Sequence, residues 1–330
     1  MNAPETLILR REDIAGTMAL ADYIEAVELA FGQLADGGMS VPPVVHIPAA
    51  GGAFHVKSAG FASGPPYLAV KVNGNFPGNP AATGLPTIQG AILLCDSRNG
   101  SLLAVVDSAE VTAMRTGAAT AVAAKYLARQ NSETATVIGC GIQGRVQLLS
   151  LAEVLPLKMV RVFDLDRRRA DAFAGLMRDE TGLEVLPVDD FANATRASDV
   201  IVTCTSSRRA FLTGEHVAPG TFIAAVGADN HDKQELAPEL VAGSRVVVDL
   251  LDQCAGIGEL HHALEAEIMT KSDVAAELGA VVAGVAQVKF GPNDVVVFDS
   301  TGSAIQDVAS AGIIYERAKD GGAALSVVFA

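Results

Sequence analysis

The chain has 330 residues, of which half are hydrophobic and 19% are charged, and its formal net charge is −14 at pH 7. This length exceeds the usual size of a single domain with one hydrophobic core, so we expect a compact globular protein of about two domains. The acidic balance argues against nonspecific nucleic-acid binding, which requires clustered Lys and Arg, and no apolar run is long enough to span a membrane.

The first residues and the cysteines bear on the cellular compartment. The start, Met1 to Thr6, lacks the basic and apolar regions of a secretory signal. The cysteines form no Cys-x-x-Cys pair and no metal-ligand spacing. We therefore expect a cytoplasmic protein with reduced, mostly buried thiols, namely Cys95, Cys140, Cys204 and Cys254.

The N-terminal third contains one predicted helix and several predicted strands. Residues 21–37 predict an amphipathic helix, because apolar residues recur there at three-to-four spacing. The apolar runs 90–95 and 102–107 predict a β-hairpin, since Asn99-Gly100 between them is a strong turn signal.

Two alternating segments between these elements, 54–58 and 67–73, each predict a strand with a lysine in it. The alternation places His55 with Lys57 on one face, and Lys71 on the same face as Ala69 and Asn73. A lysine in an apolar strand has a structural explanation, because edge strands use lysine to discourage aggregation. The alternative is that these lysines bind an anion.

A predicted helix over residues 108–129 carries Arg115 among small residues, Thr116, Gly117 and Ala118. Small neighbours allow close approach of another group. Arg115 is therefore either a fork for a carboxylate or phosphate or an ordinary charge on a helix surface.

The segment Thr134 to Gly144 organises the chain. A β-branched run, Thr136-Val-Ile138, leads into glycines at the spacing G-x-G-x-x-G, and helical periodicity follows. Glycines at this spacing allow a sharp turn, close approach of a pyrophosphate, and close packing of helix on strand. The helix start then favours an anion. This pattern predicts a dinucleotide site, and the alternative is a glycine turn that binds nothing.

A second strand, 159–163, ends at Asp164, where an acid reaches the ribose hydroxyls of such a cofactor. A carboxylate there favours NAD over NADP, since it repels a 2′-phosphate. NADP stays possible, because Arg161, Arg167 and Arg168 lie nearby in sequence.

From residue 134 onward, strand and helix patterns alternate, with further strands predicted at 183–188, 199–204, 222–226, 244–249 and 294–298. This is the pattern of a parallel sheet covered on both faces. Ligands in such sheets bind at the carboxyl ends of strands, which here carry Thr205-Ser-Ser207, Gly227-Ala-Asp-Asn230 and Asp249. A last strand, 324–329, is expected to return to the N-terminal half.

Neighbouring histidines, His261 and His262, lie in a helical segment. Adjacent side chains on a helix point about 100° apart and do not make the i, i+4 pair of a helical metal site. No metal is predicted.

Several motifs together resemble the ornithine cyclodeaminase/μ-crystallin family across nearly the whole chain. They are Lys71-Val-Asn-Gly, Gly84-Leu-Pro-Thr-Ile-Gln-Gly90, Met114-Arg-Thr-Gly-Ala-Ala119, Ile138-Gly-Cys-Gly-Ile-Gln-Gly144, Gly227-Ala-Asp229 with Lys233-Gln-Glu-Leu236, and Val297-Phe-Asp-Ser-Thr-Gly302. The resemblance implies an α/β fold: a Rossmann doubly wound parallel sheet, residues 126–302, inserted into a discontinuous α/β domain. That outer domain, residues 1–125 plus 303–330, would bind substrate and form a homodimer.

The resemblance also implies roles for residues. Lys71 and Arg115 would hold the substrate carboxylate, and Asp229 would transfer the proton at the substrate nitrogen, a role that requires a pKa raised by apolar neighbours. Substrate would further meet Lys57, His55 and Gly302. The cofactor would contact Thr116, Gly139, Gly141, Ile142, Gln143, Gly144, Asp164, Thr205, Ser206, Val226, Ala228 and Ser300.

One departure from the family pattern concerns the carboxylate site. Many members carry an arginine after a proline where this chain has Pro43-Val-Val-His46. Lys57 matches a lysine found in imine-reducing members such as iminosuccinate reductases. Two further segments resemble the same branch, Ile257-Gly-Glu-Leu-His-His262 and Glu277-Leu-Gly-Ala280. An added cation suits a substrate with a second carboxylate.

The predicted activity is NAD(P)H-dependent interconversion of an α-imino acid and an L-amino acid, by hydride transfer at the α-carbon. The imino acid would be small or dicarboxylic. Two alternatives stay open: an ornithine or lysine cyclodeaminase with a recycled NAD, and a μ-crystallin-like nucleotide-binding protein without turnover.

Overall fold

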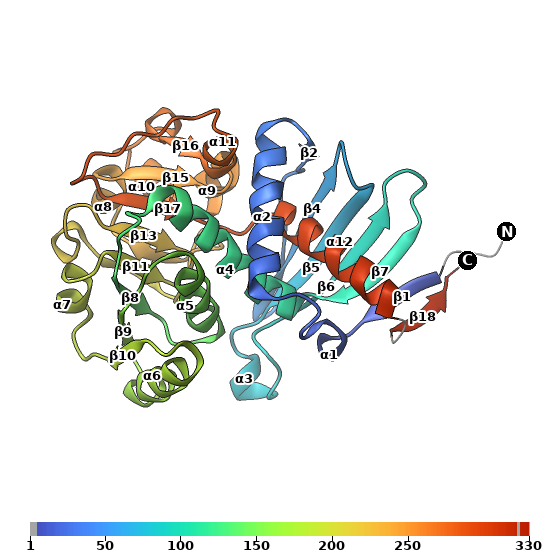
Figure 1. Ribbon diagram of the computed structural model, residues 1–330, viewed down its shortest axis with the longest axis horizontal. Coiled ribbons are helices and arrows are strands. Elements are labelled where there is room, and N and C mark those ends of the chain that lie inside the picture. The colour runs from blue at the N-terminus through green and yellow to red at the C-terminus, as the bar shows by residue number, and fades with distance from the viewer. Residues whose placement is uncertain (1–4, 322–323, 330) are drawn as a thin grey trace. The chain divides into compact units, whose positions relative to one another are not determined.

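The computed structural model describes residues 5–321 and 324–329, which divide into two compact units (Figure 1). Unit 1 contains residues 1–115 and 303–330, and unit 2 contains residues 116–302. The first boundary lies inside helix α4 (Ser108–Leu127), and the predicted boundary between residues 125 and 126 lies in the same helix.

Unit 1 is built on a sheet of eight strands in the order β18-β1-β7-β6-β5-β4-β2, with β3 also paired to β4. Strands β1 and β7 run parallel, and the other pairs are antiparallel. The predicted return of the last strand is confirmed, because β18 pairs with β1. The strands are β1 (Glu5–Leu9), β2 (Met39–Ser40), β3 (Val45–Ala49), β4 (Gly52–Phe61), β5 (Tyr67–Asn75), β6 (Ile88–Asp96), β7 (Leu102–Asp107) and β18 (Leu325–Val328).

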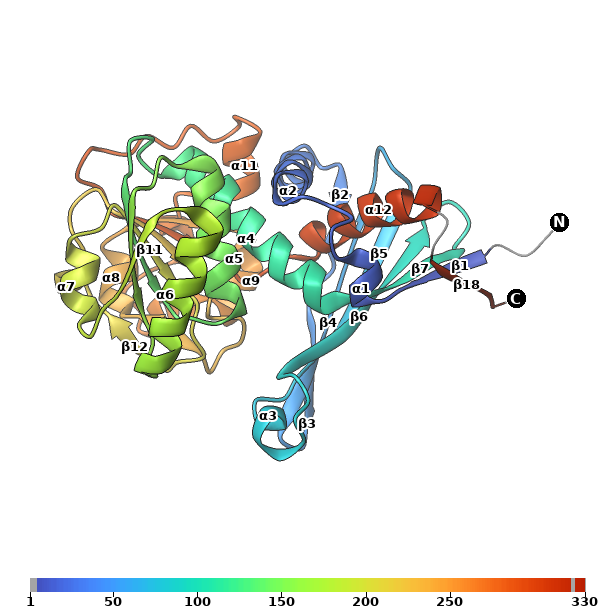
Figure 2. The same cartoon turned by 60° about the horizontal axis from the view of Figure 1, so that its bottom comes forward.

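Two long helices, α2 (Leu20–Ala35) and α12 (Ala304–Gly321), lie on one face of this sheet (Figure 2). Helix α12 packs closely, since a Cβ at Gly312 would come within 2.8 Å of the Tyr67 ring on β5. Helix α2 buries the apolar stripe that predicted it, including Tyr23, Val27 and Phe31. The short helices are α1 (Arg11–Ile14) and α3 (Asn79–Ala82).

The face that the helices cover holds the two strand lysines. Lys57 on β4 lies directly across from Lys71 on β5, and both are buried. The edge-strand explanation is wrong for both, because β5 lies between β4 and β6, and β4 lies between β5 and the pair β2 and β3. Residues that pair across strands share a face, so His55, which pairs with Asn73, lies on this face as well.

The opposite face of the same sheet is apolar and exposed. Cross-strand pairing joins Val45 to Val56, Ile47 to Phe54, and Val56 to Val72. Side chains on this face stay more than a third exposed at Val45, Ile47, Phe54, Leu68 and Val72.

Unit 2 is a doubly wound parallel sheet, as predicted. Its eight strands have the order β10-β9-β8-β11-β13-β17-β15-β16, all parallel, and helices cover both faces (Figures 1 and 2). The chain direction across the sheet reverses between β8 and β11, the point where Rossmann sheets bind nucleotide. The strands are β8 (Thr134–Ile138), β9 (Met159–Phe163), β10 (Glu184–Pro187), β11 (Val200–Thr203), β13 (Phe222–Ala225), β15 (Arg245–Val248), β16 (Ala276–Glu277) and β17 (Val296–Asp299).

The remaining elements of unit 2 are helices and a small two-stranded parallel sheet, β12 (Arg208–Leu212) with β14 (Gln234–Leu236). The helices are α5 (Ile142–Val154), α6 (Arg167–Thr181), α7 (Phe191–Arg196), α8 (Pro238–Ala242), α9 (Leu251–Ile257), α10 (Glu259–Glu265) and α11 (Leu278–Val282), with single 3₁₀ turns at Gly214–His216 and Lys271–Asp273. Among the residues described, each helix is too short or too polar to cross a bilayer.

Candidate active site

The three glycines of the nucleotide turn have the three geometries expected of them. Gly139 has a φ of +110°, which favours glycine. A Cβ at Gly144 would lie 2.1 Å from the carbonyl oxygen of Gly139, so helix and turn pack without room for a side chain. At Gly141 a Cβ would meet no atom within 4 Å. That open side is where a phosphate could approach the backbone.

The start of α5 and the end of β9 complete this turn. Gly141 is the N-cap of α5, and Gln143 in its first turn has a buried Oε1 that meets no donor among the described residues. Asp164 accepts hydrogen bonds from the backbone N–H of Cys140 at 3.0 Å and of Asp166 at 3.0 Å. Asp164 therefore ties the glycine turn to the next strand, in addition to its predicted place beside a ribose.

Buried carboxylates hold the loops at the carboxyl ends of the sheet. Glu235 accepts from the N–H of Thr205, after β11, at 2.6 Å, and from the N–H of Gly227, after β13, at 3.1 Å. A Cβ at Gly227 would lie 2.4 Å from the Glu235 carboxyl group. Glu235 therefore links two of the loops that carry predicted cofactor residues.

Helix α10 contributes a second carboxylate to this support. Glu259 accepts from the N–H of Glu235 at 2.8 Å and of Leu236 at 3.0 Å. Asp299, at the end of β17, accepts from the N–H of Leu260 at 2.9 Å. Burial raises the pKa of all three carboxyl groups, that of Asp299 to about 7, and their mutual proximity raises the pKa of Glu259 further.

Asp249, after β15, holds the loop that follows β17. Its carboxylate accepts from the N–H groups of Thr301 at 2.9 Å and Gly302 at 2.7 Å, and from the Thr301 hydroxyl at 3.0 Å. Ser300 Oγ lies 3.4 Å from the same carboxylate. The predicted nicotinamide residues Ser300 and Gly302 thus lie in a loop with a fixed backbone.

Asp229 lies in the loop after β13, and none of the described helices begins at it. Its Oδ1 lies 2.6 Å from Nζ of Lys233, and its side chain is 38% exposed. One partner of Asp229 is therefore a cation, in contrast to the apolar neighbours that the sequence analysis expected.

In unit 1, Lys71 and Arg115 meet at one carboxylate, Asp307 of α12. Lys71 Nζ lies 2.8 Å from the carboxylate, and Arg115 Nε donates to it at 3.2 Å. Arg115 Nη1 also donates to Gln306 Oε1 at 2.8 Å. Lys71, Arg115 and Asp307 are all less than 6% exposed. Arg115 is therefore not a helix-surface charge.

This cluster contains more cations than anions. Burial, together with the Arg115 and Lys57 charges, lowers the pKa of Lys71 to about 7, while Asp307 opposes this shift. Burial alone would raise the pKa of Asp307, but Lys71 and Arg115 hold it below the ordinary value. Lys71 and Arg115 share the one carboxylate of Asp307, which leaves a surplus of positive charge at this pair.

His55 extends the polar row on the same face of the sheet. Its ring lies edge-on to that of His46, with centroids 4.8 Å apart. Across from His55, on β5, lies Asn73. Its Oδ1 accepts a hydrogen bond from the Ser108 hydroxyl at 2.6 Å. His46 thus lies beside His55, at the position where the sequence analysis noted a missing arginine.

The predicted site residues fall into two groups, one in each unit. Lys57, Lys71 and His55 share one face of the unit 1 sheet, and Arg115 reaches the same carboxylate as Lys71 from α4. Asp229, Gly302 and the predicted cofactor residues belong to unit 2, where all the cofactor residues except Thr116 on α4 lie in segments that follow strands. Asp307, Gln306, Glu235 and Glu259 were not predicted from the sequence. A signal existed for Asp307, since an acid inside the apolar segment Ala304 to Ile314 requires a partner.

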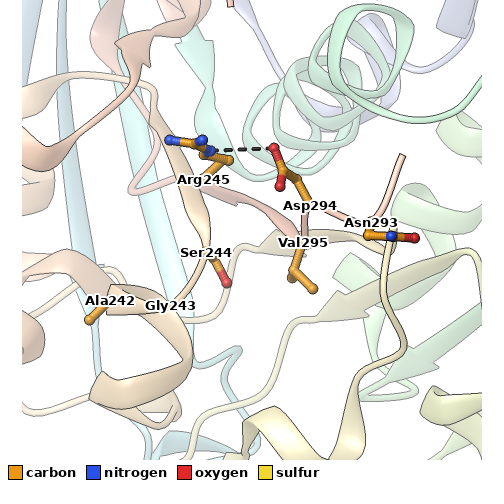
Figure 3. A pocket seen from close by; sticks show the side chains of 7 residues that line it. All are labelled: Ala242, Gly243, Ser244, Arg245, Asn293, Asp294 and Val295. Atoms are coloured by element: carbon orange, nitrogen blue, oxygen red, sulfur yellow. Dashed lines mark hydrogen bonds and ion pairs between the residues drawn. The ribbon is translucent and has the colours of Figure 1, made fainter. Parts of the chain in front are cut away.

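A separate hollow of unit 2, about 350 Å³ in volume, lies at the amino ends of β15 and β17 (Figure 3). It is lined by residues 242–245 and 293–295, and Arg245 pairs with Asp294 across it at 3.4 Å. Ligands of parallel sheets bind at the other end of the strands, so this hollow lies at the opposite ends of β15 and β17 from the predicted cofactor residues of unit 2.

The cysteines do not provide a nucleophile. All four are free thiols, as expected for a reducing compartment. Burial raises the pKa of each of them, that of Cys140 to about 12, so the thiolate form is scarce near neutral pH.

The sequence profile of the ornithine cyclodeaminase/mu-crystallin family matches residues 4–322. Alanine dehydrogenase of Archaeoglobus fulgidus is 38% identical over 95% of this chain and 95% of its own length. Iminosuccinate reductase of Paracoccus denitrificans is 36% identical over 97% of this chain and 99% of its own length.

Solved structures agree with these relatives. An archaeal alanine dehydrogenase dimer with bound NAD has a TM-score of 0.94 at 36% identity, covering 99% of this chain and 100% of that one. The Δ1-pyrroline-2-carboxylate reductase of Thermococcus litoralis, in complex with NADH and L-proline, also has a TM-score of 0.94, at 33% identity, covering 98% and 100%.

Proposed function

Because the chain belongs to the ornithine cyclodeaminase/mu-crystallin family, we propose that it interconverts an α-imino acid and an L-amino acid with a nicotinamide cofactor. Its relatives include an alanine dehydrogenase, an iminosuccinate reductase and a pyrroline-2-carboxylate reductase. The reactions that these names describe all change the order of a bond, or form or break a bond, between an α-carbon and a nitrogen. The observation that carries the proposal is the surplus of buried positive charge at Lys71 and Arg115.

The turn at residues 139–144 fits a dinucleotide. Its open side at Gly141 and the N-terminus of α5 would hold the pyrophosphate, and Asp164 would meet the adenosine ribose, which favours NAD. The loops after β11, β13 and β17, fixed by buried carboxylates, would hold the nicotinamide end. When bound, the cofactor supplies or accepts the hydride.

Lys71 and Arg115 would bind the α-carboxylate of the substrate. Asp307 already fixes both side chains, so the entropy cost of orienting them is met before substrate binds. The substrate carboxylate would offset the surplus charge and raise the pKa of Lys71 toward its ordinary value. A fixed carboxylate in turn sets the distance and angle for transfer at the neighbouring α-carbon.

Asp229 would exchange a proton with the substrate nitrogen. Its carboxylate is part of a loop held by Glu235 through Gly227, and the Lys233 ammonium at 2.6 Å orients it. A general acid or base requires hydrogen-bond reach and a proton that it can exchange near neutral pH.

A second buried lysine favours a dicarboxylic substrate. Lys57 lies directly across from Lys71, and its charge acts on Lys71. A second carboxylate on the substrate would pair with this added cation. A substrate such as iminosuccinate has that second carboxylate, whereas a small monocarboxylic imine lacks it.

The exposed apolar face of the unit 1 sheet would join two copies of the chain into a homodimer. Monomeric proteins rarely expose a contiguous apolar patch of this kind, and Val45, Ile47 and Val72 belong to it. Val72→Lys should yield monomers in light scattering, while the exposed Leu165→Lys should remain dimeric. A monomeric wild-type chain would contradict the proposal. We place the protein in the cytoplasm because its four thiols are unpaired.

The test of function is NADH and NADPH oxidation against a panel of keto acids with ammonia, namely oxaloacetate, pyruvate and glyoxylate, and against cyclic imino acids. The proposal expects oxidation with at least one of these, fastest with oxaloacetate, and the matching L-amino acid by mass spectrometry. Ammonia release from ornithine without net NADH oxidation would instead identify a cyclodeaminase. Lack of oxidation across the panel would favour a nucleotide-binding protein without turnover.

A further inference from the structure

A cluster in unit 2 contains none of the residues proposed for catalysis. His261, His262 and Glu265 of α10 each place one metal-binding atom within 4.8 Å of the other two. His261 Nε2 lies 3.5 Å from Glu265 Oε2. His261 and His262 do not have the i, i+4 spacing of a helical metal pair, but His261 and Glu265 do.

Both rings are oriented by backbone carbonyl groups. His261 Nδ1 lies 3.3 Å from the carbonyl oxygen of Ala255, and His262 Nε2 lies 2.8 Å from that of Lys233. A carbonyl oxygen only accepts, so each bonded nitrogen carries a proton, and the second nitrogen of each imidazole is the atom available to bind a metal. Metal-binding histidines show this same arrangement, with the second nitrogen donating to a carbonyl or carboxylate.

We propose that His261, His262 and Glu265 form a binding site for one divalent transition-metal ion such as Zn²⁺, which revises the expectation of no metal. Two imidazoles and one carboxylate are ligands that Zn²⁺, Co²⁺ and Ni²⁺ prefer over Mg²⁺ or Ca²⁺. Bonds of about 2.0–2.2 Å place tetrahedral ligand atoms about 3.4 Å apart, close to the His261–Glu265 distance. Glu265 is exposed, so rotation of its side chain can close the remaining gap.

The ion would have a supporting role, outside the chemistry. Its ligand His262 holds the carbonyl of Lys233, whose side chain pairs with Asp229. Glu259 of the same helix holds the N–H groups of Glu235 and Leu236. An ion on α10 would therefore stiffen the support of residues 229–236, and binding to the native state alone would raise the thermal midpoint.

The test uses the full chain without a polyhistidine tag, stripped with a chelator, and titrated with ZnCl2 in a calorimeter. Absorption of added Co²⁺ in the visible range gives a second readout of nitrogen and oxygen ligands. The variants are His261→Asn and Glu265→Gln. His231→Asn is the matched control, because His231 is exposed and lies 3.2 Å from Asp232 in the same unit.

We expect one equivalent of Zn²⁺ per wild-type chain and at least about tenfold weaker binding in both variants, with the control unchanged. Circular dichroism without metal checks that each variant is folded, and Glu265→Gln, at an exposed position, keeps the test valid should His261→Asn fail to fold. Absence of stoichiometric Zn²⁺ binding to the wild type, or binding as tight as the wild type in both His261→Asn and Glu265→Gln, would overturn the proposal and leave the cluster as a helix ion pair.

Discussion

In unit 1, Lys71 and Arg115 share the carboxylate of Asp307, with Lys57 buried across from Lys71, whereas unit 2 buries carboxylates around backbone N–H groups. A cation cluster with surplus charge is costly until an anion neutralises it. The carboxyl groups of Glu235, Glu259 and Asp299 in unit 2 accept from backbone N–H groups, and burial raises the pKa of each. The difference suggests that the first cluster binds a ligand and that the second is a support for loops.

The largest effect should come from removing a cation of the first cluster. Lys71→Met keeps the side-chain volume and leaves Asp307 and Arg115 without their third member. Loss of one member of a buried charge pair costs about 2–5 kcal/mol, so kcat/KM should fall by about thirtyfold or more. NADH affinity, measured by fluorescence titration, should be unchanged.

The control for this prediction is Lys158→Met, which breaks an exposed pair with Glu133 on unit 2. Surface pairs contribute little, so its kinetics should match the wild type. Wild-type turnover in Lys71→Met would remove Lys71 from the site, and the same result in Arg115→Met would remove Arg115.

Asp307→Asn should have the next largest effect, because it removes the counter-charge and keeps the shape. Asp307 raises the pKa of Lys71, so its loss should leave more of Lys71 neutral near pH 7. We expect kcat/KM to fall by about tenfold, mostly through KM. Asp189→Asn, at an exposed carboxylate, is the control. An unchanged KM would mean that Asp307 serves folding alone.

A smaller effect is expected from pH in the wild type. The pKa of Lys71 is lowered to about 7, so the ligand-free site loses positive charge as pH rises through 7. KM for the acid substrate should then rise, at most about tenfold per pH unit, in assays from about pH 6 to 9. Lys71→Met should lack this dependence, and a flat wild-type profile would contradict it.

The same shift has a defined sign for stability. A lysine with a depressed folded pKa loses its proton at about 7 in the native state and near 10.5 when unfolded. Between these values the unfolded chain binds more protons, so this group makes folding more favourable as pH rises. Substrate affinity and the Lys71 contribution to stability therefore change in opposite directions with pH.

The sequence predicted unit 2 better than unit 1 for a physical reason. Strand, glycine turn and helix follow one another locally, and each of Gly139, Gly141 and Gly144 has the geometry that its position in the motif predicted. The cation cluster joins β4, β5, α4 and α12, which are distant in the chain. Periodicity placed Lys57 and Lys71 on faces of their strands, but it gave no means of finding Asp307 opposite them.

The surroundings of several residues were predicted wrongly or overlooked because they also depend on contacts between distant segments. The edge-strand explanation for Lys71 failed because strand order is set by tertiary pairing. Glu235 and Glu259 were overlooked because their partners are backbone N–H groups of remote loops, which leave no mark on composition.

The smallest effect on activity should come from Glu259→Gln, among the buried carboxyl groups of unit 2. Both carboxyl oxygens of Glu259 accept from backbone N–H groups, whereas glutamine keeps its volume but has one accepting oxygen. One buried N–H then loses its partner, which should cost about 1–3 kcal/mol of unfolding free energy, while kcat changes less than about threefold. Glu265→Gln on the same helix, assayed with chelator present, should unfold like the wild type, because its carboxylate is exposed.

The loss of unfolding free energy in Glu259→Gln should depend on pH in the opposite sense to the Lys71 contribution to stability. Burial, together with Glu235 and Asp299, raises the folded pKa of Glu259, so the native chain holds a proton that the unfolded chain releases. This contribution favours folding at low pH and is lost as pH rises through the folded pKa. Glutamine cannot ionise, so urea unfolding should show a smaller difference between Glu259→Gln and wild type at about pH 9 than at about pH 6. A difference that grows with pH, or a loss of kcat/KM as large as that of Lys71→Met, would place Glu259 among the ligand-binding charges instead.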